Sequence, residues 1–280
     1  MTPWFTSTDS VADCQRKSPL DGLEARILLS HVSGLSRIQL ITQSTSLLNP
    51  TQIEALNQLT AKRVAGEPLA YLVGEREFFG LNFHVTPAVL IPRPDTELLV
   101  ELALQFTPEH GSLIDMGTGS GAIAISIASE RPDLHICASD LSPAALEIAT
   151  MNAARLLTPA RISFYQSDWF QQLPAIRFHT IVSNPPYIVK DDHHLSQGDL
   201  RFEPINALTD HADGLSAYRT IIGNAKEFLL NDGMLLMEHG YDQSESVQAL
   251  LASACFQEIQ SWPDLAGILR VTGGRWKGQS

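Results

Sequence analysis

Four consecutive residues, Asn184-Pro185-Pro186-Tyr187, could together hold a planar nitrogen group. Two prolines fix the backbone and remove two N–H donors, which leaves carbonyl oxygens free to accept hydrogen bonds. The Asn184 side chain adds one acceptor and two donors. An amide or amino group held by both N–H bonds points its nitrogen lone pair toward an electrophile, and Tyr187 could stack on its flat face. A surface turn is the alternative, since Asn-Pro also marks turns.

A second segment with chemical potential is rich in glycine, Asp115-Met116-Gly117-Thr118-Gly119-Ser120-Gly121. It lies between a predicted strand at residues 113–116 and a predicted helix at 122–129. Glycines allow a sharp turn and a close approach of a ligand to the backbone. In an open α/β sheet, ligands bind outside the carboxyl ends of the strands. The residues predicted to bind a cofactor here are Gly117, Thr118, Gly119, Ser120 and Gly121.

Acidic residues after the next two predicted strands extend this candidate cofactor site. Asp140 follows the loop by about 20 residues, a distance at which an acidic side chain can bind ribose hydroxyls in both nicotinamide and S-adenosylmethionine enzymes. Asp140 could instead cap a helix. Asp168 could accept a hydrogen bond from an adenine amine, and Trp169 could cover the base, although a buried Trp is as often part of a core. These residues predict a nucleoside cofactor without choosing between the two kinds.

The elements that must position these residues alternate between strand and helix after residue 111. The predicted strands cover residues 113–116, 134–139, 161–166, 179–183, 234–238, 256–262 and 268–272. The predicted helices cover 122–129, 142–157, 217–230 and 244–254. This alternation predicts a mostly parallel sheet with helices on both faces, and the last two strands, joined without a helix, predict an antiparallel edge.

The first part of the chain differs in character. Apolar spacing over residues 23–32 predicts a helix, and Asn49, Pro50 and Gln52 form the start of another, with a capping box. Residues 76–79 and 82–85 predict a hairpin, followed by a proline-rich linker. Asp95 is expected to cap the next helix. We therefore expect a helical domain at 1–74, a hairpin and linker at 75–94, and an α/β cofactor domain at 95–280.

Composition limits the function classes. The 280 residues are 44% hydrophobic, which suits a folded core, and 19 Lys and Arg against 31 Asp and Glu give a net charge of −12. Such an acidic chain is an unusual nucleic-acid binder. Three widely separated cysteines predict neither disulfides nor a metal site. No apolar run is long enough for a membrane span, so a cytoplasmic protein without membrane partners is expected.

The combination of the glycine loop, Asp140 and Asn184–Tyr187 resembles class I S-adenosylmethionine-dependent methyltransferases that act on planar nitrogen. Four further segments resemble the PrmC (HemK) family of release-factor glutamine methyltransferases, so that the resemblance spans nearly the whole chain. They are Ile91-Pro92-Arg93-Pro94-Asp95-Thr96-Glu97, Arg201-Phe202-Glu203-Pro204, Gly66-Glu67-Pro68 and Arg76-Glu77-Phe78. The fold implied is a Rossmann-like domain with a seven-stranded sheet, preceded by a small helical bundle and a hairpin linker.

The resemblance also implies a substrate and residue roles. The substrate is the glutamine of the Gly-Gly-Gln loop in bacterial release factors, methylated on its amide nitrogen, with S-adenosylhomocysteine as the second product. Residues 117–121 would contact the methionine part of the cofactor, Asp140 the ribose, and Asp168 and Trp169 the adenine. Residues 184–187 would hold the glutamine amide, with Asn184, Pro185 and Tyr187 as catalytic residues and Asn184 also touching the cofactor. The N-terminal domain would recognise the release factor.

Three other functions share part of this pattern. A DNA or RNA adenine-N methyltransferase has the same four-residue motif but is expected to carry a basic target-binding segment. A nicotinamide-dependent oxidoreductase fits the glycine loop only, and a non-catalytic S-adenosylmethionine-binding protein has no need of Asn184. No strong base is evident near the motif in the sequence, so we expect catalysis by positioning of the reactants.

Overall fold

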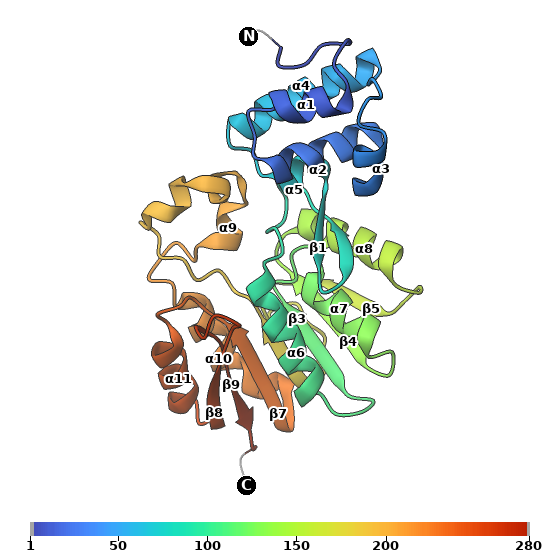
Figure 1. Cartoon of the computed structure of the whole chain (residues 1–280). Coiled ribbons are helices and arrows are strands. Elements are labelled where there is room, and N and C mark those ends of the chain that lie inside the picture. The colour runs from blue at the N-terminus through green and yellow to red at the C-terminus, as the bar shows by residue number, and fades with distance from the viewer. Residues whose placement is uncertain (1–2, 279–280) are drawn as a thin grey trace. The chain divides into compact units, whose positions relative to one another are not determined.

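The computed structural model describes residues 3–278, and the chain divides into two compact units, residues 1–74 and 75–280 (Figure 1). The first unit is helical, as expected. Its helices are α1 (Val11–Lys17), α2 (Gly22–Ser33), α3 (Arg37–Thr42), α4 (Pro50–Val64) and α5 (Leu69–Val73). The capping box of Asn49 and Gln52 at the start of α4 is confirmed. The sequence did not reveal α1, which begins with a second capping box formed by Ser10 and Asp13.

The second unit contains a small hairpin and a larger sheet. The hairpin strands are β1 (Glu75–Phe78) and β2 (Leu81–His84), paired antiparallel. The sheet strands are β3 (Ser112–Met116), β4 (His135–Asp140), β5 (Ile162–Gln166), β6 (Phe178–Ser183), β7 (Leu229–Glu238), β8 (Gln257–Pro263) and β9 (Leu269–Trp276). Their order is β5-β4-β3-β6-β7-β9-β8, and β9 runs antiparallel to both of its neighbours. The predicted seven-stranded, mostly parallel sheet with an antiparallel edge is confirmed.

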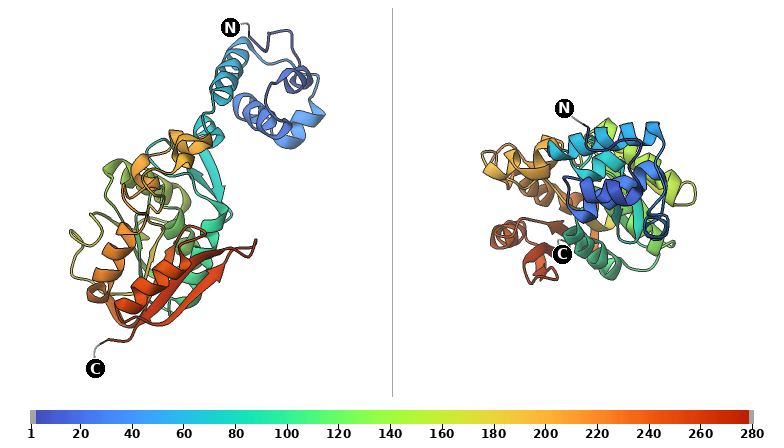
Figure 2. Two further views of the ribbon diagram at one scale, coloured as in Figure 1. Left: turned by 90° about the vertical axis from the view of Figure 1, so that its left-hand side faces the viewer. Right: turned by 45° about the horizontal axis from the view of Figure 1, so that its top comes forward.

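Helices cover both faces of this sheet. The longer ones are α6 (Glu97–Phe106), α7 (Ala122–Glu130), α8 (Pro143–Leu156), α10 (Ser216–Phe228) and α11 (Ser244–Ser253). The short ones are η1 (Pro94–Thr96), η2 (His193–Ser196), η3 (Gly198–Phe202) and α9 (Ile205–Leu208). Figure 2 gives two further views of the same strands and helices. Among residues 3–278, every helix is too short or too polar to cross a membrane.

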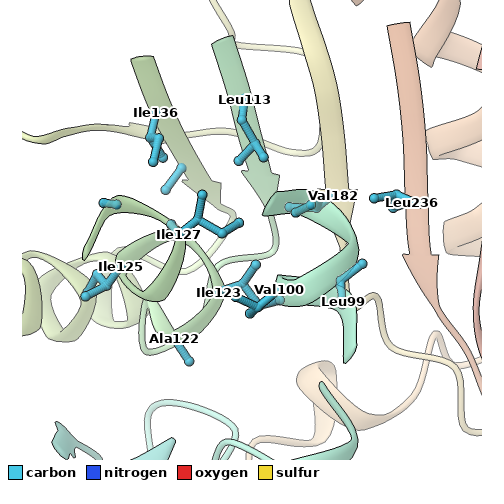
Figure 3. Packing of buried hydrophobic residues seen from close by; sticks show 14 of the residues in the cluster. Leu99, Val100, Leu113, Ala122, Ile123, Ile125, Ile127, Ile136, Val182 and Leu236 are labelled. Carbon is cyan, nitrogen blue, oxygen red and sulfur yellow. The ribbon is translucent and has the colours of Figure 1, made fainter. Parts of the chain in front are cut away.

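Alternating side chains on the central strands build two separate cores. Leu113 and Val182 point to one face, where α6 and α7 pack (Figure 3). Their neighbours Ile114 and Ile181 point to the other face, where α10 and α11 pack around Tyr218. Strands buried on both faces are mostly apolar on both sides, which explains the short hydrophobic runs that predict these strands.

Two expectations about helix ends were wrong. Asp95 does not cap a helix, because η1 occupies residues 94–96 and α6 starts at Glu97 without a side-chain cap. The Asp95 carboxylate instead lies 3.4 Å from the guanidinium of Arg270 on β9. The helix expected over 217–230 ends at Phe228, and β7 begins at once and is longer than expected.

Asn152, a fully buried residue of α8, ties the hairpin to the glycine loop. Its Oδ1 accepts from the backbone N–H of His84 at 2.8 Å, and its Nδ2 donates to the carbonyl of His84 at 2.9 Å. The same Nδ2 donates to the carbonyl of Ser120 at 2.9 Å. One amide thus satisfies polar backbone groups of two distant segments.

We expect Asn152→Ala to lower the free energy of unfolding of the second unit by about 2–4 kcal/mol, because three hydrogen bonds of a buried amide are lost. Urea denaturation followed by tryptophan fluorescence measures this, since three of the four tryptophans lie in residues 75–280. The control is Asn224→Ala on the exposed face of α10, which should shift stability by less than about 0.5 kcal/mol. Equal stability of the two variants would contradict the role given to Asn152.

Candidate active site

Four parallel strands bring the predicted site residues to one edge of the sheet. Met116 at the end of β3 pairs with Ser139 of β4 and with Ser183 of β6, and Ser183 pairs with Met237 of β7. The segments that follow these strands therefore leave the sheet at the same edge. These segments are the glycine loop, the turn at Asp140, the motif at residues 184–187, and the turn after Glu238.

The glycine loop uses glycine for different physical reasons at two positions. Gly119 has φ +55, and a Cβ placed on it would have no atom within 4 Å, so its outer face is open. Gly121 has φ +83, and a Cβ there would lie 2.7 Å from Cδ1 of Ile125. Gly121 thus allows close packing of α7, whereas Gly119 leaves backbone accessible to a ligand. Each of these positions disfavours an L-side chain by conformation alone.

Asp140 holds the glycine loop against β4. Its Oδ2 accepts from the N–H of Gly119 at 2.9 Å, and its Oδ1 accepts from the N–H of Ser142 at 2.9 Å. Burial raises the pKa of Asp140, and these backbone hydrogen bonds oppose that rise. The cap of α8 comes from Ser142, whose Oγ accepts from the N–H of Ala145. Asp140 is therefore not needed as the helix cap, and ribose binding remains its predicted role.

Trp169 lies beside the glycine loop, whereas the contacts of Asp168 are with its own segment. Trp169 has φ +50, an uncommon conformation for a residue other than glycine. A Cβ placed on Gly117 would lie 3.9 Å from Cζ3 of the indole, so the ring borders the loop as a base-covering side chain must. The same ring also packs against the apolar core under α10. Its surroundings therefore fit both predicted roles of Trp169, the covering of a base and a place in the core. Asp168 accepts from Nε2 of Gln171 at 3.0 Å.

The motif at residues 184–187 is held from three sides. Asn184 donates from Nδ2 to Oγ1 of Thr96 at 3.3 Å, and Pro185 is buried. The carbonyl of Tyr187 accepts from Nε2 of Gln243 at 3.1 Å. A Cβ on Gly214 would lie 2.5 Å from that carbonyl oxygen, so only glycine fits there. Burial raises the pKa of Tyr187, which keeps the phenol neutral.

Two buried carboxylates at this edge were not assigned a role from the sequence. Oδ1 of Asp115 and Oε2 of Glu238 are buried and have no hydrogen-bond partner within residues 3–278. Burial raises the pKa of each carboxyl to about 7. Glu238 was not among the residues expected near the motif, and Asn184 is one of the groups that lower its pKa. One pattern in the sequence could have pointed to Glu238: it is the last residue of a predicted strand, and Asp115 and Asp140 lie within one residue of the ends of two others.

A further ion pair joins the linker to the loop after η3. Arg93 pairs with Oε1 of Glu203, and Oε2 of Glu203 accepts from the N–H of Ile91 at 3.0 Å. Glu203 is buried, and these two donors offset the cost of placing its charge away from water. The segments around Arg93 and Glu203 lie far apart in the sequence. This ion pair explains why each of them has a charged residue next to a proline.

The residues present fit a nucleoside cofactor with a cationic or polar amino acid part. The open face at Gly119 lets a ligand approach the backbone, the indole beside Gly117 offers a stacking surface, and Oδ1 of Asp115 is an acceptor without a partner in the described residues. Within the described part of the chain, no group of three His, Cys, Asp or Glu side chains could hold a metal ion.

Segments of both units match the models of known protein families. Residues 94–199 match the model of the "Methyltransferase small domain", and residues 13–74 match that of the "PrmC N-terminal domain". A solved methyltransferase of Pyrococcus furiosus shares the fold, with a TM-score of 0.55 and 15% identity over 79% of this chain and 99% of that chain.

Relatives named release factor glutamine methyltransferase match along most of the chain. The protein of Burkholderia pseudomallei (strain K96243) is 53% identical over 279 residues, which cover 97% of this chain and 98% of the relative. That of Bordetella pertussis (strain Tohama I) is 52% identical over 258 residues, or 91% of this chain and 95% of the relative. With identity of this degree over nearly the full length of both relatives, the chain belongs to the family of release factor glutamine methyltransferases.

Proposed function

We propose that this chain transfers a methyl group from S-adenosylmethionine to the side-chain amide nitrogen of a glutamine in bacterial peptide chain release factors. The glutamine is that of the Gly-Gly-Gln loop. The names of the relatives support the release factor as substrate. The helical unit, residues 1–74, contributes recognition of the release factor, and residues 75–94 connect it to the catalytic domain. Because release factors act in translation, we place the reaction in the cytoplasm.

One observation carries the proposal: Asn184 turns its amide nitrogen inward to Thr96. Its Oδ1 makes no hydrogen bond to the part of the chain that the structure describes, and the next residue, Pro185, has a carbonyl but no N–H. Two acceptors on consecutive residues are the number that the two N–H bonds of a primary amide require. Tyr187 supplies an uncharged ring for the flat face of that amide.

An amide nitrogen is a weak nucleophile because its lone pair is delocalised. S-adenosylmethionine supplies an electrophilic methyl group when bound, and the residues that would hold it are 117–121, Asp140, Asp168, Trp169 and Asn184. Asn184 and the Pro185 carbonyl accept both N–H bonds and so fix the direction of the nitrogen lone pair. Orientation of reactants can supply about 7–11 kcal/mol of barrier reduction. The same two oxygens stabilise the positive charge that develops on nitrogen.

The charge of the chain supports a protein substrate over a nucleic acid. An adenine-N methyltransferase needs phosphate contacts, and a net charge of −12 opposes them. We therefore propose that no nucleic acid binds directly.

Transfer of label from S-adenosylmethionine tests the substrate. The protein is incubated with a wild-type release factor, with a release factor whose loop glutamine is changed to alanine, and with duplex DNA. We expect label on the wild-type release factor alone. Label on DNA, or label that does not depend on that glutamine, would refute the assignment.

We expect Asn184→Ala to lower kcat by about 100- to 1,000-fold, the usual effect of removing one group that stabilises transition-state charge. The affinity for S-adenosylmethionine should change far less. Steady-state kinetics and calorimetric titration separate the two effects, with Asn224→Ala on the exposed face of α10 as the control. A variant that keeps its turnover, or that loses only cofactor affinity, contradicts the role of Asn184.

Gly119→Ala tests the open face of the loop. It should lower affinity for S-adenosylmethionine at least about 10-fold, because a methyl group enters space that the cofactor needs. Gly267→Ala is a matched control, since Gly267 also has positive φ and no atom within 4 Å of a built Cβ, but lies in the β8–β9 turn. Both variants should lose about 1–2 kcal/mol of stability from backbone strain. Equal cofactor affinity in the two would place the cofactor elsewhere.

A further inference from the structure

The register of the sheet places Glu238 next to Asn184. Ser183 of β6 pairs with Met237 of β7, and Asn184 and Glu238 are the residues that immediately follow this pair. Neighbouring parallel strands carry side chains at equivalent positions to the same side of the sheet. Thr96, at the end of η1, is buried beside both of them.

The contacts of these three residues decide how the Asn184 amide is turned. The register places the Glu238 carboxyl beside Asn184, and the Thr96 hydroxyl and the Asn184 amide lower its pKa, as donors to the charged form do. A carboxylate can only accept, so Asn184 must present N–H to it. The second N–H faces Oγ1 of Thr96 at 3.3 Å. The Asn184 oxygen is then the atom left for an incoming group.

We infer that Glu238 is a positioning residue for methyl transfer: its buried, ionised carboxylate holds the amide nitrogen of Asn184 so that the Asn184 oxygen faces the substrate nitrogen. The inference rests on the proposed function. A negative charge behind Asn184 polarises the amide and makes its oxygen a stronger acceptor. The charge also favours the positive charge that grows on the substrate nitrogen during transfer.

The charged surroundings of Glu238 set the pH at which it can act. Burial and, to a smaller degree, the charge of Asp95 raise its pKa to about 7, against the opposing effects of Thr96, Arg270 and Asn184. The two phenols nearby, Tyr187 and Tyr218, are kept neutral because burial raises the pKa of each. If the ionised form orients Asn184, kcat rises as the pH increases through about 7 and levels off above it.

The test compares Glu238→Gln, which keeps the size and removes the charge, with Glu227→Gln on the exposed face of α10. We expect Glu238→Gln to lower kcat about 10- to 100-fold at alkaline pH, the effect of losing a charged hydrogen bond. Its KM for S-adenosylmethionine should stay within about twofold of the wild type. The rise of kcat with pH that depends on Glu238 should disappear. Glu238→Asp keeps the charge and should retain that rise with a smaller loss.

Thr96→Val provides a second route that leaves the carboxylate in place. It removes the hydroxyl that accepts from Asn184 and that also lowers the pKa of Glu238, and we expect kcat to fall at least about fivefold. If Glu238→Gln does not fold, as judged by thermal melting and cofactor binding, Thr96→Val and Glu238→Asp test the inference in its place. Wild-type turnover in both would then overturn the inference.

The outcomes separate this inference from the function on which it rests. A wild-type enzyme that methylates the release factor, with a folded Glu238→Gln variant of equal kcat and equal pH profile, overturns the inference alone. A loss confined to melting temperature or to cofactor affinity also overturns it, because that is what a merely structural residue would give. A wild-type enzyme that does not methylate the release factor refutes the proposed function together with the inference.

Discussion

The parallel pairing of β3 with β4 on one side and β6 on the other is the constraint on which the site depends. It brings the carboxyl ends of these strands, and of β7, to one edge, so that segments far apart in the sequence meet there. Each strand is buried on both faces and is therefore held in register by apolar contacts above and below. A slip of one residue would turn every one of these side chains to the opposite face. The position of Asn184 thus follows from the packing of residues such as Leu113 and Val182.

The same edge concentrates buried charge. Asp115, Asp140 and Glu238 end or nearly end β3, β4 and β7, and burial raises the pKa of all three. Such groups are costly to bury unless donors meet them. Asp140 receives two backbone N–H groups, and Glu238 receives help from Thr96 and Asn184, but one oxygen each of Asp115 and Glu238 has no donor within residues 3–278.

Much of this arrangement could be predicted from the sequence because its signals are local. Strand–helix alternation gave the sheet, and the glycines and the Asn-Pro-Pro-Tyr segment marked two of the strand ends. The ends of helices were less predictable: Asp95 is a typical helix-capping residue, but it lies within η1, and its carboxylate is 3.4 Å from Arg270. The position of Glu238 beside Asn184 could not be predicted, because it depends on the register between β6 and β7, which no local sequence pattern encodes. The contact of Thr96 with Asn184 likewise depends on the folded chain, which places the end of η1 next to the end of β6.

The central claim is that the substrate glutamine amide donates both N–H bonds to Asn184 Oδ1 and the Pro185 carbonyl. A crystal structure of the protein with S-adenosylhomocysteine and a peptide containing the Gly-Gly-Gln sequence tests it directly. We expect the glutamine nitrogen within hydrogen-bond distance of both oxygens, with the Asn184 nitrogen turned to Thr96 and Glu238. A glutamine amide bound away from Asn184, or an Asn184 whose nitrogen faces the substrate, would contradict it.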